Sequence, residues 1–240
     1  MTIEEIHREF DILLDKVSSS AYPEIQDYQK DVFLNNAMDK FIKQRYGLNN
    51  IYRTGFEQTQ KRTDDLKNLV ITKYATVSEL NDISFFNYLI YKVDIESLFN
   101  DNLLENSYDG DYMFYIKSMA YVQKGSCNKW SNVNLVYQND LATLLNDPFN
   151  KPSPENPIIY FEDGNIFCVV GNGSVDKFQL TFIKRPDQMN LGTYGQVKVE
   201  CELSDHTHRE IISIAVTSAL EDIESQRVQS NLVINENKIE

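Results

Sequence analysis

The spacing of apolar residues changes twice along the chain, and this change constrains the fold more than any single motif. Apolar residues recur every three or four positions over 2–17, 28–46 and 56–70, as they do in amphipathic helices. Between about 76 and 203 lie short segments rich in aromatic and β-branched residues, which are typical of strands. Helical spacing returns at 204. The pattern predicts an α+β fold with helices at both ends of the chain.

Local signals predict where several elements begin and end. Thr2 and Glu5 form a capping-box pattern before the first helix, and Gly47 is placed to end the second. Asp163-Gly164 predicts a hairpin turn. Strands are expected over 111–122, 132–137, 158–161, 165–170 and 177–184, and we favour a strand over a short helix for 83–93. One or two helical turns, capped by Asn139 or Asp140, are expected over 139–145.

The domain organisation follows from the order of these segments. We expect an N-terminal helical bundle that is completed by a C-terminal helix and carries an inserted β-rich domain. The expected parts are 1–107 for the helices, with a strand or insertion at 76–107, then 108–203 for the β-rich domain, 204–230 for the closing helix and 231–240 for a tail.

Composition excludes some classes of function. The 36 acidic residues outnumber the 23 basic ones, and the formal net charge of −13 disfavours a protein that grips nucleic-acid phosphates. Three widely spaced cysteines without a C-x-x-C pair predict neither a disulfide framework nor a structural zinc site. No apolar run approaches the ~20 residues of a membrane span, and no cationic-apolar leader is visible at the N-terminus. We expect no membrane contact and no cofactor.

The segment "CELSDHTHRE", residues 201–210, concentrates Cys201, Asp205, His206, His208 and Glu210. A metal-dependent hydrolase or metal-binding protein using Asp205, His206 and His208 is one interpretation. Two histidines at i, i+2 do not share a helical face, however, and the helical zinc pattern needs i, i+4. Ser204 or Asp205 as N-cap, or Thr207 with Glu210 as a capping box, instead favours the start of a helix. We favour helix initiation, and no catalytic or metal residue is predicted.

Several segments occur in an order that resembles virion proteins of crAss-like tailed bacteriophages. These segments are "FEQTQKRTDDLKNLV", "DYMFYIKSMAYV", "NDLATLLNDPFNKPSPENPIIYF", "FQLTFIKRP" and "LSDHTHREIISIAVTSALEDIESQR". The chain is similar to the ring or head-to-tail connector proteins near the portal of these short-tailed phages. The resemblance covers about 30–230. It departs at Asp109-Gly110, where Leu-Pro is expected, and in a longer insertion over 84–107.

The resemblance implies a non-enzymatic structural subunit of a closed homo-oligomeric ring, expected to be twelvefold. Its implied partners are the portal protein and other ring or tail proteins, and DNA would pass through the lumen without specific binding. The implied location is the portal-tail region of the virion, after assembly in the cytoplasm of the bacterial host. Structural or interface roles are implied for Phe56, Glu57, Arg62, Asp64, Asp65, Asp147, Pro148, Phe149, Lys184, Pro186, His206, His208 and Glu210. An acidic cytosolic protein that binds a host factor stays open as a further alternative.

Overall fold

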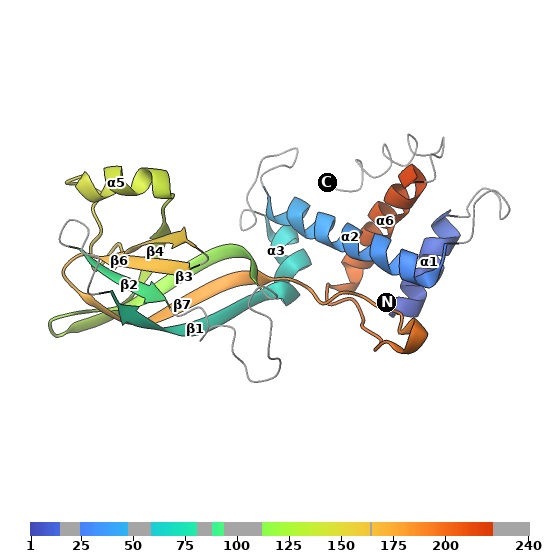
Figure 1. Cartoon of the computed structure of the whole chain (residues 1–240), viewed down its shortest axis with the longest axis horizontal. Helices are drawn as coiled ribbons and strands as arrows, with labels where there is room; N and C mark the ends of the chain where they lie inside the picture. Colours follow the sequence, from blue (N-terminus) through green and yellow to red (C-terminus); the bar gives the residue numbers. More distant parts are fainter. Residues whose placement is uncertain (15–24, 48–58, 81–87, 94–111, 164, 223–240) are drawn as a thin grey trace. The chain divides into compact units, whose positions relative to one another are not determined.

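The computed structural model describes residues 1–14, 25–47, 59–80, 88–93, 112–163 and 165–222 (Figure 1). The chain forms two compact units. One comprises Met1–Leu69 together with Pro186–Glu240, and the other is Val70–Arg185. These boundaries lie earlier than the predicted ones near 107 and 203. The mixed α+β class is confirmed, with helices in the first unit and a seven-stranded barrel in the second.

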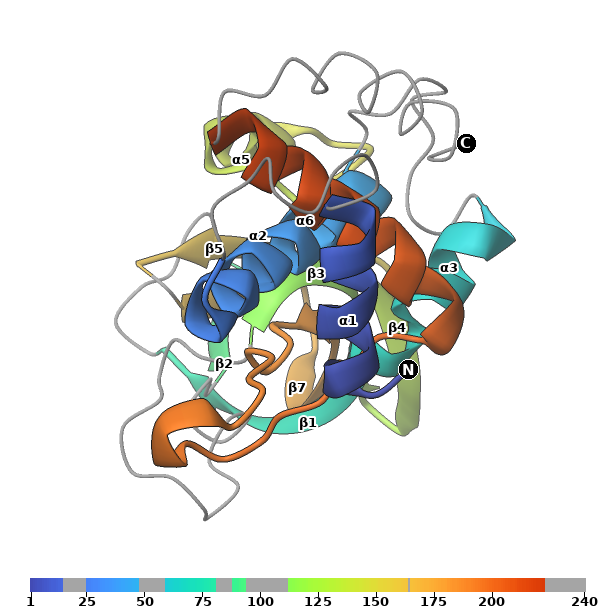
Figure 2. The same cartoon turned by 90° about the vertical axis from the view of Figure 1, so that its right-hand side faces the viewer.

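The first unit is built mainly from helices around an apolar core. Its elements are α1 (Ile3–Leu14), α2 (Asp27–Tyr46), α3 (Gln60–Leu66), α6 (His208–Asp222) and the 3-10 turns η2 (Lys67–Leu69), η3 (Thr193–Gly195) and η4 (Asp205–Thr207). α6 packs against α1 and α2, and Figure 2 shows these three helices together. Fully buried side chains include Ile3, Phe10, Leu34, Phe41, Ile42, Leu66, Ile212, Ala215 and Leu220. The apolar stripes seen in the sequence therefore face one another here.

Helix ends in this unit agree with the local signals at two places and differ at a third. The Thr2–Glu5 capping box is present, with hydrogen bonds of 3.0 and 3.3 Å. Gly47 ends α2 as predicted, although its backbone is extended rather than left-handed. The predicted helix over 56–70 is wrong at its C-terminal end, because α3 stops at Leu66 and Val70 already belongs to a strand. Its first residues, 56–58, lie outside the described residues.

The second unit is a closed barrel. Its strands are β1 (Val70–Glu79), β2 (Leu89–Val93), β3 (Tyr112–Lys124), β4 (Cys127–Leu135), β5 (Ile158–Glu162), β6 (Asn165–Val170) and β7 (Ser174–Lys184), and their order around the barrel is β1-β2-β6-β5-β4-β3-β7. Neighbouring strands pair antiparallel except β4 and β5, which pair parallel. Each predicted strand is present in whole or in part, whereas β1 was not predicted.

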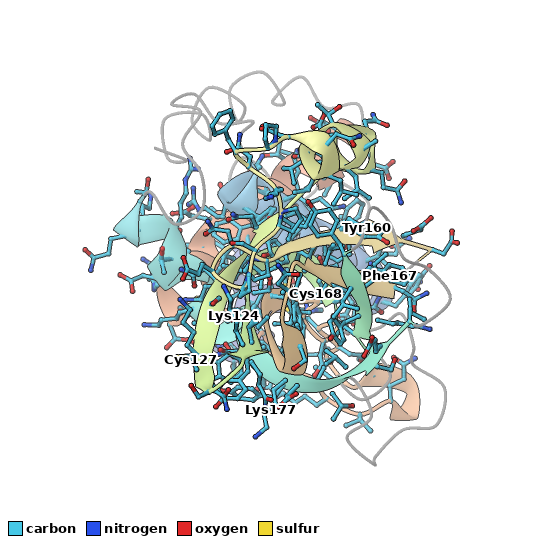
Figure 3. The ribbon with its side chains drawn as sticks, turned by 90° about the vertical axis from the view of Figure 1, so that its left-hand side faces the viewer. Lys124, Cys127, Tyr160, Phe167, Cys168 and Lys177 are labelled. Carbon is cyan, nitrogen blue, oxygen red and sulfur yellow. The ribbon has the colours of Figure 1, made fainter. Side chains whose placement is uncertain are left out.

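Side chains pack on both surfaces of the strands. The interior is filled by apolar residues that include Val93, Ala120, Ile159, Cys168, Phe178 and Phe182. A second apolar cluster, on the outer surface of β2, β5 and β6, is covered by α5 (Gln138–Asn146) through Leu145. There the rings of Tyr160 and Phe167 stack with centroids 5.2 Å apart. In Figure 3 Cys168 lies inside the ring of strands and Lys177 projects from its outer side.

Turns of the barrel follow the sequence signals only in part. A hairpin lies at the predicted position, since Glu162 pairs with Asn165 and Asp163 adopts a left-handed φ of 48°, while residue 164 lies outside the described residues. The cap predicted for α5 is wrong. Its N-cap is Tyr137, whose backbone oxygen accepts from the Asp140 N–H, and no side chain caps the helix. Across the described parts of the chain, every helix is too short or too polar to cross a membrane.

Candidate functional site

Residues 201–210 form the joint that leads into α6, where Asp205 Oδ1 lies 3.8 Å from His208 Nδ1 while the His206 side chain contacts a different residue. Asp205 is exposed and accepts from the Met1 amine at 2.8 Å, which lowers the pKa of its carboxyl. The His206 ring nitrogen Nε2 lies 2.7 Å from Asp65 Oδ1. His208 is buried and donates to the Leu203 carbonyl at 3.1 Å. Within the described ranges no group of three His, Cys, Asp or Glu residues is arranged to hold a metal ion.

The start of α6 differs from the capping predicted for it. Ser204 precedes η4, but its side chain makes no capping bond. Thr207 is buried and its hydroxyl donates to the Ser204 carbonyl at 2.8 Å, while Glu210 binds Arg45. The Thr207–Glu210 capping box is therefore absent, because both side chains have tertiary or local partners that compete with the helix end. A helix nevertheless begins at this segment, as predicted, because η4 leads directly into α6 at His208.

Glu210 and His206 contact the buried Arg45–Asp65 ion pair where three helices meet, although the His206 side chain itself is 56% exposed. Arg45 of α2 binds Asp65 of α3 at 2.8 Å and also binds Glu210 of α6. His206 contacts Asp65 from η4. The Arg45 guanidinium lies 4.7 Å from the centre of the Phe41 ring, a cation–π geometry. Charges so far from water need compensating partners, so this cluster fixes α2, α3 and the start of α6 relative to one another.

Arg62 and Asp64, on the same short helix, occupy opposite environments. Arg62 is buried, and its pKa is lowered by burial and by the nearby Arg45 charge. Asp64 is exposed to solvent. The cluster thus brings together Asp65, His206 and Glu210 from the predicted set; Arg62 lies near Arg45, and Asp64 is outside the cluster. The sequence did not single out Arg45 as a site residue. The available signal was its position just before Tyr46-Gly47, at the expected end of the second helix.

A second polar cluster between α1 and α2 was also missed. His7 is buried, and its Nε2 lies 2.8 Å from Asp31 Oδ1. Lys30 binds Asp11 at 2.8 Å and Asp27 at 3.5 Å. The available signal was His7 itself, which interrupts the apolar stripe of the first helix. A histidine in such a stripe indicates a polar partner on the facing helix.

The segment after α5 holds one aromatic side chain in solvent. Asp147 accepts from the Phe149 N–H at 2.9 Å and from the Asn150 side-chain amide at 2.7 Å, and these hydrogen bonds lower the pKa of its carboxyl. Phe149 is 92% exposed at the tip of this turn, and Pro148 is exposed beside it. A single exposed ring is normal on a protein surface, so Phe149 by itself does not indicate a partner.

The remaining predicted residues take other positions. Lys184 ends β7 and pairs in register with Tyr112, and Pro186 is buried just after the barrel. Phe56 and Glu57 lie outside the described residues. The described members of the predicted set therefore form a helical group around Asp65, an exposed turn and two residues at the end of the barrel, with Asp64 apart from all three.

Comparison with known proteins decides the family. The sequence pattern of the family described as phage tail ring protein 3/4 matches residues 1–231. The chain belongs to this family. The match spans both the helical residues and the barrel, so the two units form one family architecture.

Two curated relatives come from one phage. Ring protein 4/5 of Bacteroides phage crAss001 is 23% identical over 236 residues, covering 91% of this chain and 92% of the relative. Ring protein 3 of the same phage is 25% identical over 231 residues, covering 92% and 95%. The resemblance to ring proteins of crAss-like phages is confirmed, and with it a structural ring protein of the virion.

Proposed function

We propose that this ring-family chain is a non-enzymatic subunit of a closed ring between the portal and the tail of a short-tailed phage, surrounding the DNA channel. The observation that carries the proposal is the family match over 1–231, supported by two relatives named as ring proteins along almost their whole length. A twelvefold ring is the expected stoichiometry. The proposed location is the portal-tail region of the virion, after assembly in the host cytoplasm.

The charge of the chain supports a role around moving DNA. A net charge of −13 repels phosphates, so a wall of such subunits would let DNA pass without binding it. The proposed partners are further copies of the chain, the portal protein and other ring or tail proteins.

Roles for the predicted residues follow from their positions. We assign Arg62, Asp65, His206, His208 and Glu210 to holding a helical bundle that α6 completes. Asp64 on its exposed side and the turn of Asp147, Pro148 and Phe149 are assigned to contacts with neighbouring proteins. Lys184 and Pro186, where the barrel ends, are assigned to positioning the connection. Phe56 and Glu57 keep the interface role that the resemblance implies.

The test is assembly with the portal protein encoded by the same genome. The chain and the portal protein are purified separately, mixed, and examined by mass photometry and electron microscopy. We expect closed rings of the chain bound coaxially to the portal, with twelve copies in class averages. A chain that stays monomeric with portal and with neighbouring ring proteins would contradict the proposal.

Metal analysis of the same sample tests the non-enzymatic part. The side chains of Asp205, His206 and His208 each have other partners in the fold. We expect no stoichiometric zinc or manganese, and normal assembly by a His206→Gln variant. Stoichiometric metal lost from that variant would instead revive a metal-dependent role.

A further inference from the structure

Three aromatic side chains gather on the outer surface of the barrel, away from α5. Tyr74 of β1, Tyr121 of β3 and Trp130 of β4 form this group, which we call the outer aromatic face. The Trp130 ring centroid lies 6.2 Å from that of Tyr74 and 5.4 Å from that of Tyr121. Tyr74 is 63% exposed and Trp130 38% exposed. Apolar rings in mutual contact and open to water indicate a surface that binds a partner.

Strand register explains why these rings are neighbours. Tyr121 pairs directly with Trp130 across β3 and β4, and it pairs with Lys177 of β7 on its other side. Tyr74 of β1 pairs with Gln179, which also belongs to β7. The inward residues of these strands, such as Ala120 and Phe178, fill the barrel interior, so the alternate residues must point outward. The strand register therefore determines that these three rings lie side by side on the outer surface.

The charge around this face is opposite to that of the whole chain. Of the six lysines in β1, β3, β4 and β7, Lys117 and Lys177 stand at outward positions, whereas Lys73 and Lys129 pair in register with the inward residues Leu180 and Val122. Lys117 and Lys177 are exposed on the same outer surface. Asp176, beside Lys177, is engaged by the Gln123 side-chain amide. In a chain of net charge −13, two exposed lysines therefore lie on the same outer surface as the outer aromatic face.

The helical unit carries the complementary charge. Met1–Leu69 and Pro186–Glu240 hold 14 Lys and Arg against 22 Asp and Glu, a formal charge of −8. Exposed acids there include Glu4, Glu5, Asp64, Glu221 and Asp222. Surfaces of opposite charge favour encounter and correct register between partners.

We propose that the outer aromatic face of one copy binds the acidic helical unit of the next copy in the ring. This inference rests on the proposed function and specifies its subunit contact. A closed ring of more than two copies needs two different surfaces on each subunit, joined head to tail. Two copies of the aromatic face placed against each other would bring Lys117 and Lys177 near the same lysines, which disfavours a two-fold dimer. The helical unit of a second copy is a different surface and is acidic, so it allows a head-to-tail contact without bringing lysines together.

Nucleic acid is the other class of partner that aromatic rings beside lysines suit. The overall charge of −13 works against it, because distant acids repel phosphates at low salt. The second copy is therefore favoured, and DNA binding is treated as an outcome that would overturn the proposal.

The first experiment measures ring assembly of full-length variants. Tyr74→Ser with Trp130→Ser removes the rings, and Lys117→Glu with Lys177→Glu reverses the charge. Tyr137→Ser, at an aromatic residue 75% exposed elsewhere in the barrel unit, is the matched control. Circular dichroism and thermal melting establish that each variant folds, and rings on the portal are then counted by mass photometry over a concentration series.

Both face variants are expected to raise the concentration for half-assembly at least about tenfold, since buried aromatic residues dominate binding at interfaces. The control is expected to assemble like the wild type. If the wild type forms rings and the folded face variants form them equally well, this inference fails while the proposed function stands. If the wild type forms no rings, both fail.

The second experiment identifies what covers the face. Tyr74 is replaced by the photo-crosslinking residue p-benzoylphenylalanine, and assembled rings are irradiated and mapped by mass spectrometry. Cross-links to residues 1–69 or 186–240 of another copy are expected. Cross-links to the barrel of another copy, to the portal, to another phage protein or to DNA would each overturn the proposal.

Discussion

Arg45 of α2 and Asp65 of α3 form an ion pair of 2.8 Å in which the two side chains are only 5% and 2% exposed. The pair lies at the meeting point of α2, α3 and α6, where Glu210 and His206 complete the cluster. Burying charges this deeply is unfavourable unless each has partners. The helical unit is therefore expected to be sensitive to the loss of Arg45 or Asp65, the two members that are shielded from water.

Replacing Arg45 by Met is expected to lower the free energy of unfolding by about 3–5 kcal/mol, because Asp65 would keep a buried charge without its main partner. Chemical denaturation measures the change. Lys61→Met is the control, since Lys61 is half exposed and lies 3.9 Å from Glu210. Its effect is expected to stay below about 1 kcal/mol. Equal effects of the two variants would contradict the importance of burial.

His208 makes stability depend on pH. Burial lowers the pKa of His208 below its usual 6.5, so the folded state binds this proton less readily than the unfolded state. The stabilising contribution is present above about pH 6.5 and is lost as the pH falls below that value. His208→Gln, which keeps a donor for the Leu203 carbonyl, is expected to reduce the slope of unfolding free energy between roughly pH 6.5 and 5. An unchanged slope would refute this assignment.

The three cysteines should differ widely in reactivity. Cys127 is exposed at the start of β4, whereas burial raises the pKa of Cys168 to about 12 and that of Cys201 to about 11. Alkylation needs a reachable thiolate. Iodoacetamide at neutral pH is expected to modify Cys127 first and to leave Cys168 unmodified until unfolding, as read by intact mass and peptide mapping. Early modification of Cys168 would be inconsistent with the closed barrel.

Gly171 is required by a close contact rather than by its backbone angle. A Cβ at this position would lie 2.5 Å from the Pro152 carbonyl oxygen. Gly171→Ala is therefore expected to destabilise the protein by about 1–3 kcal/mol in thermal or chemical melts. Gly125→Asn is a contrast, because Gly125 has a φ of 60° and open space around it, and Asn tolerates the left-handed region. Its effect is expected to be small.

The sequence was informative wherever local chemistry decided the structure. The Thr2–Glu5 capping box, the end of α2 at Gly47 and the turn at Asp163 each depend on neighbouring residues, and all three are present. The strand β1 was missed because helical spacing at Leu66 continues to Val70, and Lys73 interrupts the alternation that follows. Pairing with β7 and β2 determines that strand, and those contacts are distant in sequence.

Long-range contacts also decided most of the candidate site. Nothing near Asn134 and Leu135 indicates that they pair in parallel with Ile158 and Ile159, which helps close the barrel. The ion pair between Arg45 and Asp65 joins α2 to α3, and it forms only because tertiary packing brings the two helices together. Residue types identified His206 and Glu210 as notable, but their partners could be found only in the folded chain.

The first and last strands of the barrel are neighbours, with Val70 paired to Ile183. The chain therefore enters and leaves the barrel through adjacent antiparallel strands, whose paired Cα atoms lie about 5 Å apart. Because the two ends of 70–185 are close together, this segment connects Leu69 to Pro186 as a short loop would. The entropic cost of closing the chain within the helical unit is therefore small. The length of the barrel insertion could therefore change without altering the distance between Leu69 and Pro186, the residues at which the helical unit is interrupted.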